Sequence, residues 1–238
     1  MLVRAAAHRG SQIVVAWPDI VTGLVAAAGM LAAVLLAGAL DSVLGLGPLA
    51  THMSQHIVVM NAAAPLAALA ILCFAPAPRV FTDRIGPLAL ATTAQIVLLW
   101  GWHTPQSMAA AWHQPGLMLA MHLSLFAAAI LFWYAVFSIR GRDRWQPVLA
   151  LLVTGKLFCL LGALLIFAPR TLYALDLARH AGHGPGVSGL ADQQLAGLLM
   201  ITACPLTYVT AGVIIAARWV LELDGAAADT PLRLEEGA

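Results

Sequence analysis

Six apolar segments, each about long enough to cross a bilayer, constrain this chain more than any other feature. A membrane-crossing helix needs roughly 20 mostly apolar residues, and Pro, Gly and charged residues separate the segments. Only 10% of the residues are charged, far fewer than in water-soluble domains. We therefore predict an all-α integral membrane protein, with one transmembrane domain over residues 1–223 and a flexible cytoplasmic tail over 224–238. The predicted spans are residues 20–40, 52–74, 85–103, 117–138, 147–168 and 192–220.

The basic residues predict the orientation of these spans. Two arginines, Arg170 and Arg179, lie in connections on one side, and Lys156 lies within the fifth span, where we expect it to face the bundle interior or a cavity. The positive-inside rule places the N and C termini in the cytoplasm, and the net charge of +1 gives no reason to expect nucleic acid as a partner. The other side carries nine arginines: Arg4, Arg9, Arg79, Arg84, Arg140, Arg142, Arg144, Arg218 and Arg233.

Seven of the eight histidines fall on the non-cytoplasmic side of this topology. His52 and His56 are four residues apart at the start of the second span, so a helix places both rings on one face, where they can share one ion. Polar side chains at membrane depth are costly and usually functional, which favours a functional pair here. The others on this side are His103, His113, His122, His180 and His183; the last two and His113 lie in loops, where solvated histidines are commoner than metal ligands.

Methionines accompany the histidines at helical spacing. Met60 continues the face of the His pair one turn deeper, and Met118 with His122 repeats the spacing on the fourth span. Imidazole together with thioether suits Cu(I). The alternative for each methionine is simple packing, its commoner role.

Two further positions allow a structural or a functional interpretation. His103 ends the third span just before Thr104-Pro105, where an interfacial histidine reaching toward water is the simpler explanation. Asp192 opens the sixth span and is either a helix N-cap or a metal ligand or acceptor for a histidine N–H. Gln193, Gly197, Met200 and Cys204 share one face of that span, for which packing against the second span is favoured over a path of soft ligands.

Proline and cysteine add little chemistry. Pro65 is expected to kink the second span below the His pair. Cys73, Cys159 and Cys204 are far apart and form no metal or disulfide motif, so each is expected to be a small buried side chain.

At these residues the sequence resembles the CtaG family of polytopic bacterial cytochrome c oxidase assembly factors, associated with caa-type oxidases. The resemblance rests on four short motifs in order between about residues 50 and 205. It implies that His52, His56, His103, His122 and Asp192 form the functional set, and that the chain handles copper for an oxidase in the bacterial inner membrane. Two departures are Met118, where relatives often have histidine, and Ala196-Gly197 in place of a glycine pair. The motifs are His52-Met53-x-x-His56 with Ala64-Pro65-Leu66, Trp102-His103-x-Pro105, His122-Leu-Ser-x-Phe126 running to Phe132-Trp133, and Asp192-Gln193-x-x-x-Gly197.

Three functions follow from these patterns. The first is a copper-binding assembly factor without catalytic turnover, whose metal site faces the periplasm or cell exterior and whose partners are oxidase subunits within the lipid bilayer. The second is an intramembrane zinc hydrolase, which needs an open coordination position and a general base; no glutamate lies near the histidines in sequence, so Asp192 would have to serve. The third is a haem b protein with axial histidines such as His56 and His122.

Overall fold

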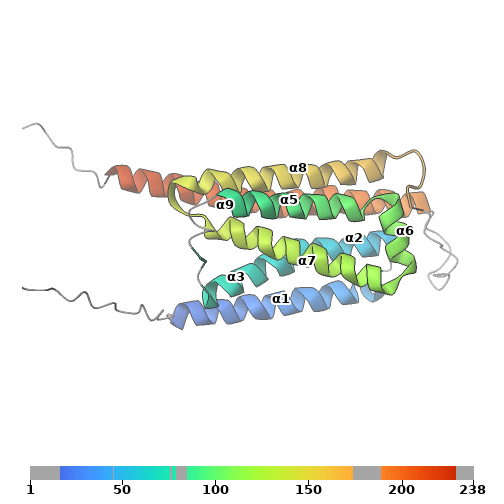
Figure 1. Ribbon diagram of the computed structural model, residues 1–238, viewed down its shortest axis with the longest axis horizontal. Coiled ribbons are helices and arrows are strands. Elements are labelled where there is room, and N and C mark those ends of the chain that lie inside the picture. The colour runs from blue at the N-terminus through green and yellow to red at the C-terminus, as the bar shows by residue number, and fades with distance from the viewer. Residues whose placement is uncertain (1–16, 45, 76, 79–84, 174–188, 229–238) are drawn as a thin grey trace, which may run out of the picture.

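The computed structural model describes residues 17–44, 46–75, 77–78, 85–173 and 189–228, and in these residues every regular element is helical. The six predicted spans are confirmed: six helices are long and apolar enough to cross a membrane. They run side by side, with the short α6 crossing one end of the bundle (Figure 1). The elements are α1 (Trp17–Leu44), α2 (Pro48–Val58), η1 (Val59–Ala63), α3 (Ala64–Phe74), α5 (Ile85–Trp102), α6 (Pro105–His113), α7 (Pro115–Ser138), η2 (Gly141–Arg144), α8 (Trp145–Phe167) and α9 (Gly189–Ala228).

The second span is a single membrane crossing interrupted by a π-helical turn. α2 and α3 are joined by η1, and the axis of the span bends there (Figure 1). Pro65 has no N–H to donate to the preceding turn. The carbonyl oxygen of Met60 accepts instead from the indole N–H of Trp133 on α7, at 3.1 Å. The bend expected from Pro65 therefore takes the form of a π turn whose freed carbonyl is bonded by a neighbouring helix.

Close backbone packing joins α8 to α9. A Cβ added at Gly197 would lie 2.6 Å from the carbonyl oxygen of Gly162, and one added at Gly162 would lie 2.9 Å from that of Gly197. Small residues allow membrane helices to approach this closely. Gly197 thus packs against the fifth span, and not against the second as its helical face suggested, while Met200 and Cys204 turn toward a cavity beside α2.

Buried polar contacts fix the other helices around this pair. The amide nitrogen of Gln95 on α5 donates to the hydroxyl of Tyr208 on α9 at 2.7 Å. The indole of Trp102 donates to Ser124 of α7 at 3.0 Å. Many large apolar side chains point outward, as expected for a surface in contact with lipid; examples are Leu90, Leu206 and Val213.

Lys156 contradicts its expected position. It lies at the middle of α8 and is exposed on the outer surface of the bundle. A lysine at the centre of a lipid-facing helix costs roughly 2.5–3.5 kcal/mol on insertion scales. The expectation was wrong because it assumed that the chain's own helices would bury the lysine and so avoid this cost.

The last helix is longer than its predicted span. α9 continues to Ala228, past Leu223, where the tail was expected to begin. Residues 229–238 lie outside the described residues, as do His8, His180 and His183, and the division into a membrane domain and a flexible tail remains a prediction.

Candidate metal centre

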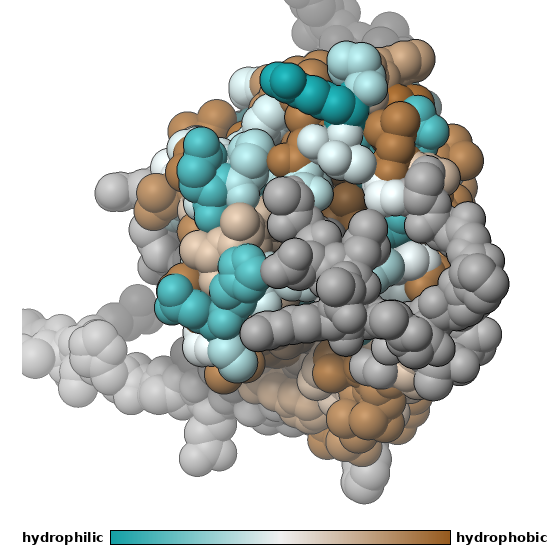
Figure 2. Space-filling model, turned by 90° about the vertical axis from the view of Figure 1, so that its right-hand side faces the viewer, coloured by the Kyte–Doolittle hydropathy of each residue, from teal (hydrophilic) through white to brown (hydrophobic). Residues whose placement is uncertain are grey.

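The histidines of three spans meet at one end of the bundle, where α2 begins, α5 ends and α7 begins. Figure 2 looks onto this end, where hydrophilic residues gather on the surface and hydrophobic ones lie toward its edges. The imidazoles themselves are not part of that surface: His52, His56 and His103 are only 4–5% exposed. A water-poor cluster of polar rings therefore lies just beneath the polar end of the molecule.

His52 and His56 form the first pair of the cluster. They lie four residues apart on α2, and their Nε2 atoms are 3.0 Å apart. The two rings meet edge to face, with centroids separated by 4.4 Å. The helical spacing alone predicted that the two rings share a face, and this prediction is confirmed.

His122 of α7 completes a triad with that pair. Its ring stacks on His56 with centroids 4.8 Å apart and meets His52 edge to face at 5.3 Å. Its Nδ1 lies 2.8 Å from the carbonyl oxygen of Met118. A carbonyl only accepts, so Nδ1 carries the proton and the Nε2 of the neutral ring carries a lone pair.

One potential ligand atom from each of His52, His56 and His122 lies within 4.8 Å of the others. Metal–imidazole bonds of about 2.0 Å place the ligand atoms of a shared ion roughly 3.3–3.5 Å apart. The separations in the triad bracket this value, from 3.0 Å between the Nε2 atoms of His52 and His56 to an upper limit of 4.8 Å. The triad can therefore hold a metal ion.

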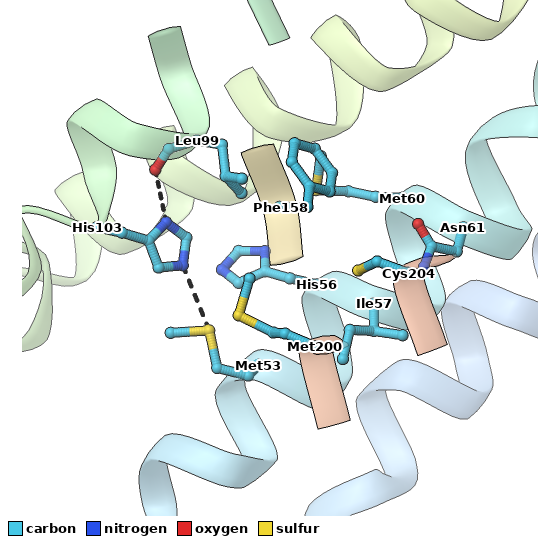
Figure 3. A pocket seen from close by; sticks show the side chains of 10 residues that line it. All are labelled: Met53, His56, Ile57, Met60, Asn61, Leu99, His103, Phe158, Met200 and Cys204. Carbon is cyan, nitrogen blue, oxygen red and sulfur yellow. Dashed lines mark hydrogen bonds between the residues drawn. The ribbon is translucent and has the colours of Figure 1, made fainter. Parts of the chain in front are cut away.

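His103 lies beside the triad and not within it. Its ring centroid is 5.8 Å from that of His56, and its Nδ1 lies 2.6 Å from the carbonyl oxygen of Leu99. The same tautomer argument leaves a lone pair on Nε2, which is 3.3 Å from the sulfur of Met53. Figure 3 shows both contacts.

Tyr173 holds the segment after α8 against this site. Its hydroxyl donates to the carbonyl oxygen of His103 at 2.9 Å. Burial raises the pKa of Tyr173 to about 12, so the phenol keeps the proton that this bond requires. The contact fixes the backbone that carries His103.

Asp192 has a structural partner far away in the sequence. Its two carboxylate oxygens accept from the backbone N–H groups of Leu49 and Ala50, at 2.8 and 3.0 Å. These amides begin α2 and have no partner within the helix, and a negative charge at a helix N-terminus is also favoured by the helix dipole. Of the roles considered for Asp192, helix capping fits these contacts, although the capped helix is α2 and not its own α9.

The remaining predicted residues lie around the triad. Met60 is buried and lines a cavity bordered by His56. Met118 contacts His122 through its carbonyl oxygen. His113 is exposed at the end of α6, apart from the triad.

Met53 is a candidate that the sequence reasoning missed. Its thioether is 1% exposed and lies against His103. Met53 and Met60 are seven residues apart, which places them on one face of an α-helix, and this spacing is the sequence signal that identifies the pair.

The fold and this cluster define a class: polytopic helical membrane proteins with a buried histidine site able to hold a metal ion. The family model of the cytochrome c oxidase caa3 assembly factor (Caa3_CtaG) matches residues 1–222. The chain belongs to this family, as the resemblance of its motifs indicated. No curated protein and no solved structure shows a significant match to the chain.

Proposed function

We propose that this protein binds one Cu(I) ion with His52, His56 and His122 and supplies it to a caa3-type cytochrome c oxidase during assembly. The observation that carries the proposal is the convergence of three imidazoles within 4.8 Å inside the bundle. Membership in a family of oxidase assembly factors supports a cytochrome c oxidase as the partner. The ion is cargo, so the protein performs no catalytic turnover.

The chemistry of the surroundings favours monovalent copper over zinc. The cost of burying an ion rises with the square of its charge, so a buried divalent ion gains more than a monovalent one from anionic ligands nearby. Both oxygens of Asp192 are occupied by the amides of α2. Neutral imidazoles with thioethers close by suit Cu(I), which accepts three ligands of this kind.

Other residues position the ligands. Met118 and Leu99 hold His122 and His103 by their carbonyl oxygens, and hydrogen bonds of this kind orient a ligating imidazole. Asp192 fixes the start of the helix that carries His52 and His56. We assign neither Met60 nor Met118 a bond to the ion.

We further propose that the metal site faces the periplasm or cell exterior and that both termini are cytoplasmic. Arg140, Arg144 and Arg218 lie at the opposite end of the bundle from the histidines. Basic residues are enriched on the cytoplasmic side of membrane proteins. Labelling of a cysteine introduced at exposed His113 by an impermeant maleimide in intact cells tests this orientation.

Geometry weighs against the two other functions. A hydrolase needs a general base near its zinc-bound water, and Asp192 is engaged in capping α2. A haem iron with two axial histidines needs their rings on opposite faces of the macrocycle. The rings of His56 and His122 stack on each other with centroids 4.8 Å apart, which leaves no room for a macrocycle between them.

The experiment combines anaerobic Cu(I) titration of the purified protein with caa3 oxidase activity in cells. The His52→Asn/His122→Asn variant is expected to lose one equivalent of Cu(I) and most of the oxidase activity. His113→Asn, which changes an exposed histidine at the same end, is the matched control and should behave as wild type. Unchanged copper binding and oxidase activity in the double variant, with normal protein levels in the membrane, would overturn the proposal.

A further inference from the structure

A second group of soft ligands surrounds a small cavity next to the triad. The cavity has a volume of about 10 Å³, close to the space that one water molecule or one ion needs. It lies between α2, η1, α5, α8 and α9, and His56 borders both the cavity and the triad. Its ligand-bearing side chains are Met53, Met60, Met200, Cys204, His56 and His103.

The contact between His103 and Met53 is the most informative feature of this cavity. The Nε2 of His103 carries a lone pair, because the ring proton is on Nδ1, which donates a hydrogen bond to the carbonyl oxygen of Leu99. A thioether sulfur is also only an acceptor. Two acceptor atoms therefore face each other at 3.3 Å with no proton to share, an arrangement that a soft cation between them would stabilise.

Two more observations describe the surroundings of this contact. Both polar atoms of the Asn61 amide, which borders the cavity, are buried, and the amide lies within hydrogen-bonding reach of the Cys204 thiol. Figure 3 shows the sulfur of Met200 beside the ring of His56, with Cys204 and Asn61 on the far side of that ring from His103. Sulfur ligands from two helices thus lie against the two histidines of the cavity, Met53 of α2 against His103 and Met200 of α9 beside His56.

We propose that this cavity is a second Cu(I) site, formed by Met53, His103 and Met200 and sharing His56 with the triad. Thioether and imidazole ligands are those that Cu(I) prefers. An ion can pass between the two sites by exchanging ligands at His56, with no change in its oxidation state. The identity of the ion rests on the proposed function, whereas the existence of a second site rests on the cavity and its ligands.

The test is the stoichiometry of Cu(I) binding, measured anaerobically against a chromophoric Cu(I) chelator. Wild-type protein is expected to bind two equivalents. Met53→Leu/Met200→Leu should bind one, since Leu for Met preserves packing volume. Met108→Leu changes a fully buried methionine that does not line the cavity and should still bind two.

The outcomes separate the two proposals. If the wild type and the Met53→Leu/Met200→Leu variant both bind one equivalent, and X-ray absorption of the wild type shows no sulfur ligand, the second site is overturned and the triad stands. If His52→Asn/His122→Asn binds as many ions as the wild type, the triad fails. Loss of one equivalent in each variant supports both sites.

A different observation carries a second inference, which concerns the exposed Lys156. This residue is eleven positions from each end of α8 (Trp145–Phe167), or about 16 Å along the helix at 1.5 Å per residue. That distance exceeds the reach of a lysine side chain toward either interface. The neighbouring turns of the same face expose only apolar side chains, among them Leu152, Val153 and Leu160.

We infer that this face of α8 binds a transmembrane helix of a different membrane protein that carries Asp or Glu at mid-membrane depth. A carboxylate is the partner that makes a buried ammonium group tolerable in lipid. A second copy of this chain cannot supply it, because the acidic residues of the described spans lie near helix ends: Asp19, Asp41, Asp192, Glu222 and Asp224.

Photocrosslinking tests this inference in cells with the full-length protein. A crosslinker at Leu160 is expected to capture a helix containing Asp or Glu, identified by mass spectrometry, and the crosslink should be lost in Lys156→Met and kept in Lys156→Arg. A crosslinker at exposed Leu90 on α5 is the control and should not capture that helix. Crosslinks only to lipid or to a second copy, or a crosslink that persists in Lys156→Met, would overturn the inference.

Discussion

The two ends of the helical bundle differ in packing and in chemistry. At the histidine end, His52, His56 and His103 are buried, carbonyl oxygens hold His103 and His122, and the adjoining cavity measures about 10 Å³. At the opposite end, α3, α7 and α9 line a groove of about 1380 Å³, which carries Arg140, Arg144 and Arg218. Tight packing at one end therefore accompanies the residues that can bind an ion, whereas the basic end has an open groove lined by apolar side chains and arginines.

Buried side chains that bond backbone groups of other segments are concentrated near the histidine end. Asp192, Tyr173 and Gln193 all bond backbone groups near the histidine end, and Gln193 accepts from the N–H of Leu172 at 2.7 Å. The arginine end has one ion pair between described residues, Arg144 with Glu222 at 3.0 Å, and Glu222 is half exposed. Substitutions that remove these buried contacts at the histidine end should therefore affect both stability and copper binding, whereas loss of the exposed pair at the arginine end should affect neither strongly.

Asp192→Ala is expected to have the largest effect. It leaves the amides of Leu49 and Ala50 buried and unpaired, at a cost of about 1–3 kcal/mol for each unsatisfied group, and frees the start of the helix that carries His52 and His56. We expect a lower melting temperature and at least tenfold weaker Cu(I) binding. Asp143→Ala at the other end is the control, and equal effects of the two substitutions would contradict the comparison.

Gly47→Ala disturbs the same cap by crowding the carboxylate of Asp192. A methyl group at Gly47 would overlap the carboxylate of Asp192, and relief of such overlap costs about 1–3 kcal/mol. Thermal unfolding in detergent should show this loss together with weaker copper binding. Gly116→Ala, near the start of α7, meets no atom within 4 Å and should be neutral or slightly stabilising; a neutral Gly47→Ala would show that the cap is not tightly packed.

Trp133→Phe probes the middle of the bundle, between the two ends. It removes the donor to the Met60 carbonyl at the π turn, a loss of about 1–2 kcal/mol for a buried hydrogen bond. Stability should fall, with a smaller change in copper affinity than Asp192→Ala produces. Phe132→Leu controls for the loss of aromatic volume alone. If Trp133→Phe weakened Cu(I) binding more than Asp192→Ala, the π turn and not the Asp192 cap would determine the copper affinity.

Arg144→Ala is expected to have the smallest effect. The pair with Glu222 is partly exposed, and such pairs contribute about 0–1 kcal/mol. Copper stoichiometry and affinity should match those of the wild type. A clear loss of copper binding would show that the two ends of the bundle are coupled, which the comparison excludes.

Much of the fold was predictable because the bilayer imposes a length and an apolar composition on each span. The same rule placed His52, His56, His103 and His122 at one end, and helical spacing paired His52 with His56. These features depend on neighbouring positions in the chain, which the sequence displays directly.

Features that depend on contacts between distant segments were not predictable. Asp192 caps a helix that begins 144 residues earlier, at Pro48, and nothing in its own neighbourhood indicates that partner. The contact of Met53 with His103 and the outward direction of Lys156 likewise depend on how helices rotate against one another. Hydropathy is too uniform along these spans to fix that rotation.

X-ray absorption at the copper edge tests the central claim most directly. The sample is the Met53→Leu/Met200→Leu variant loaded anaerobically with one equivalent of Cu(I), so that the triad is the site that remains. The account predicts copper coordinated by imidazole nitrogens alone, with this signal abolished by adding His52→Asn and His122→Asn. Copper without imidazole ligands, or a signal unchanged by those two substitutions, would contradict it.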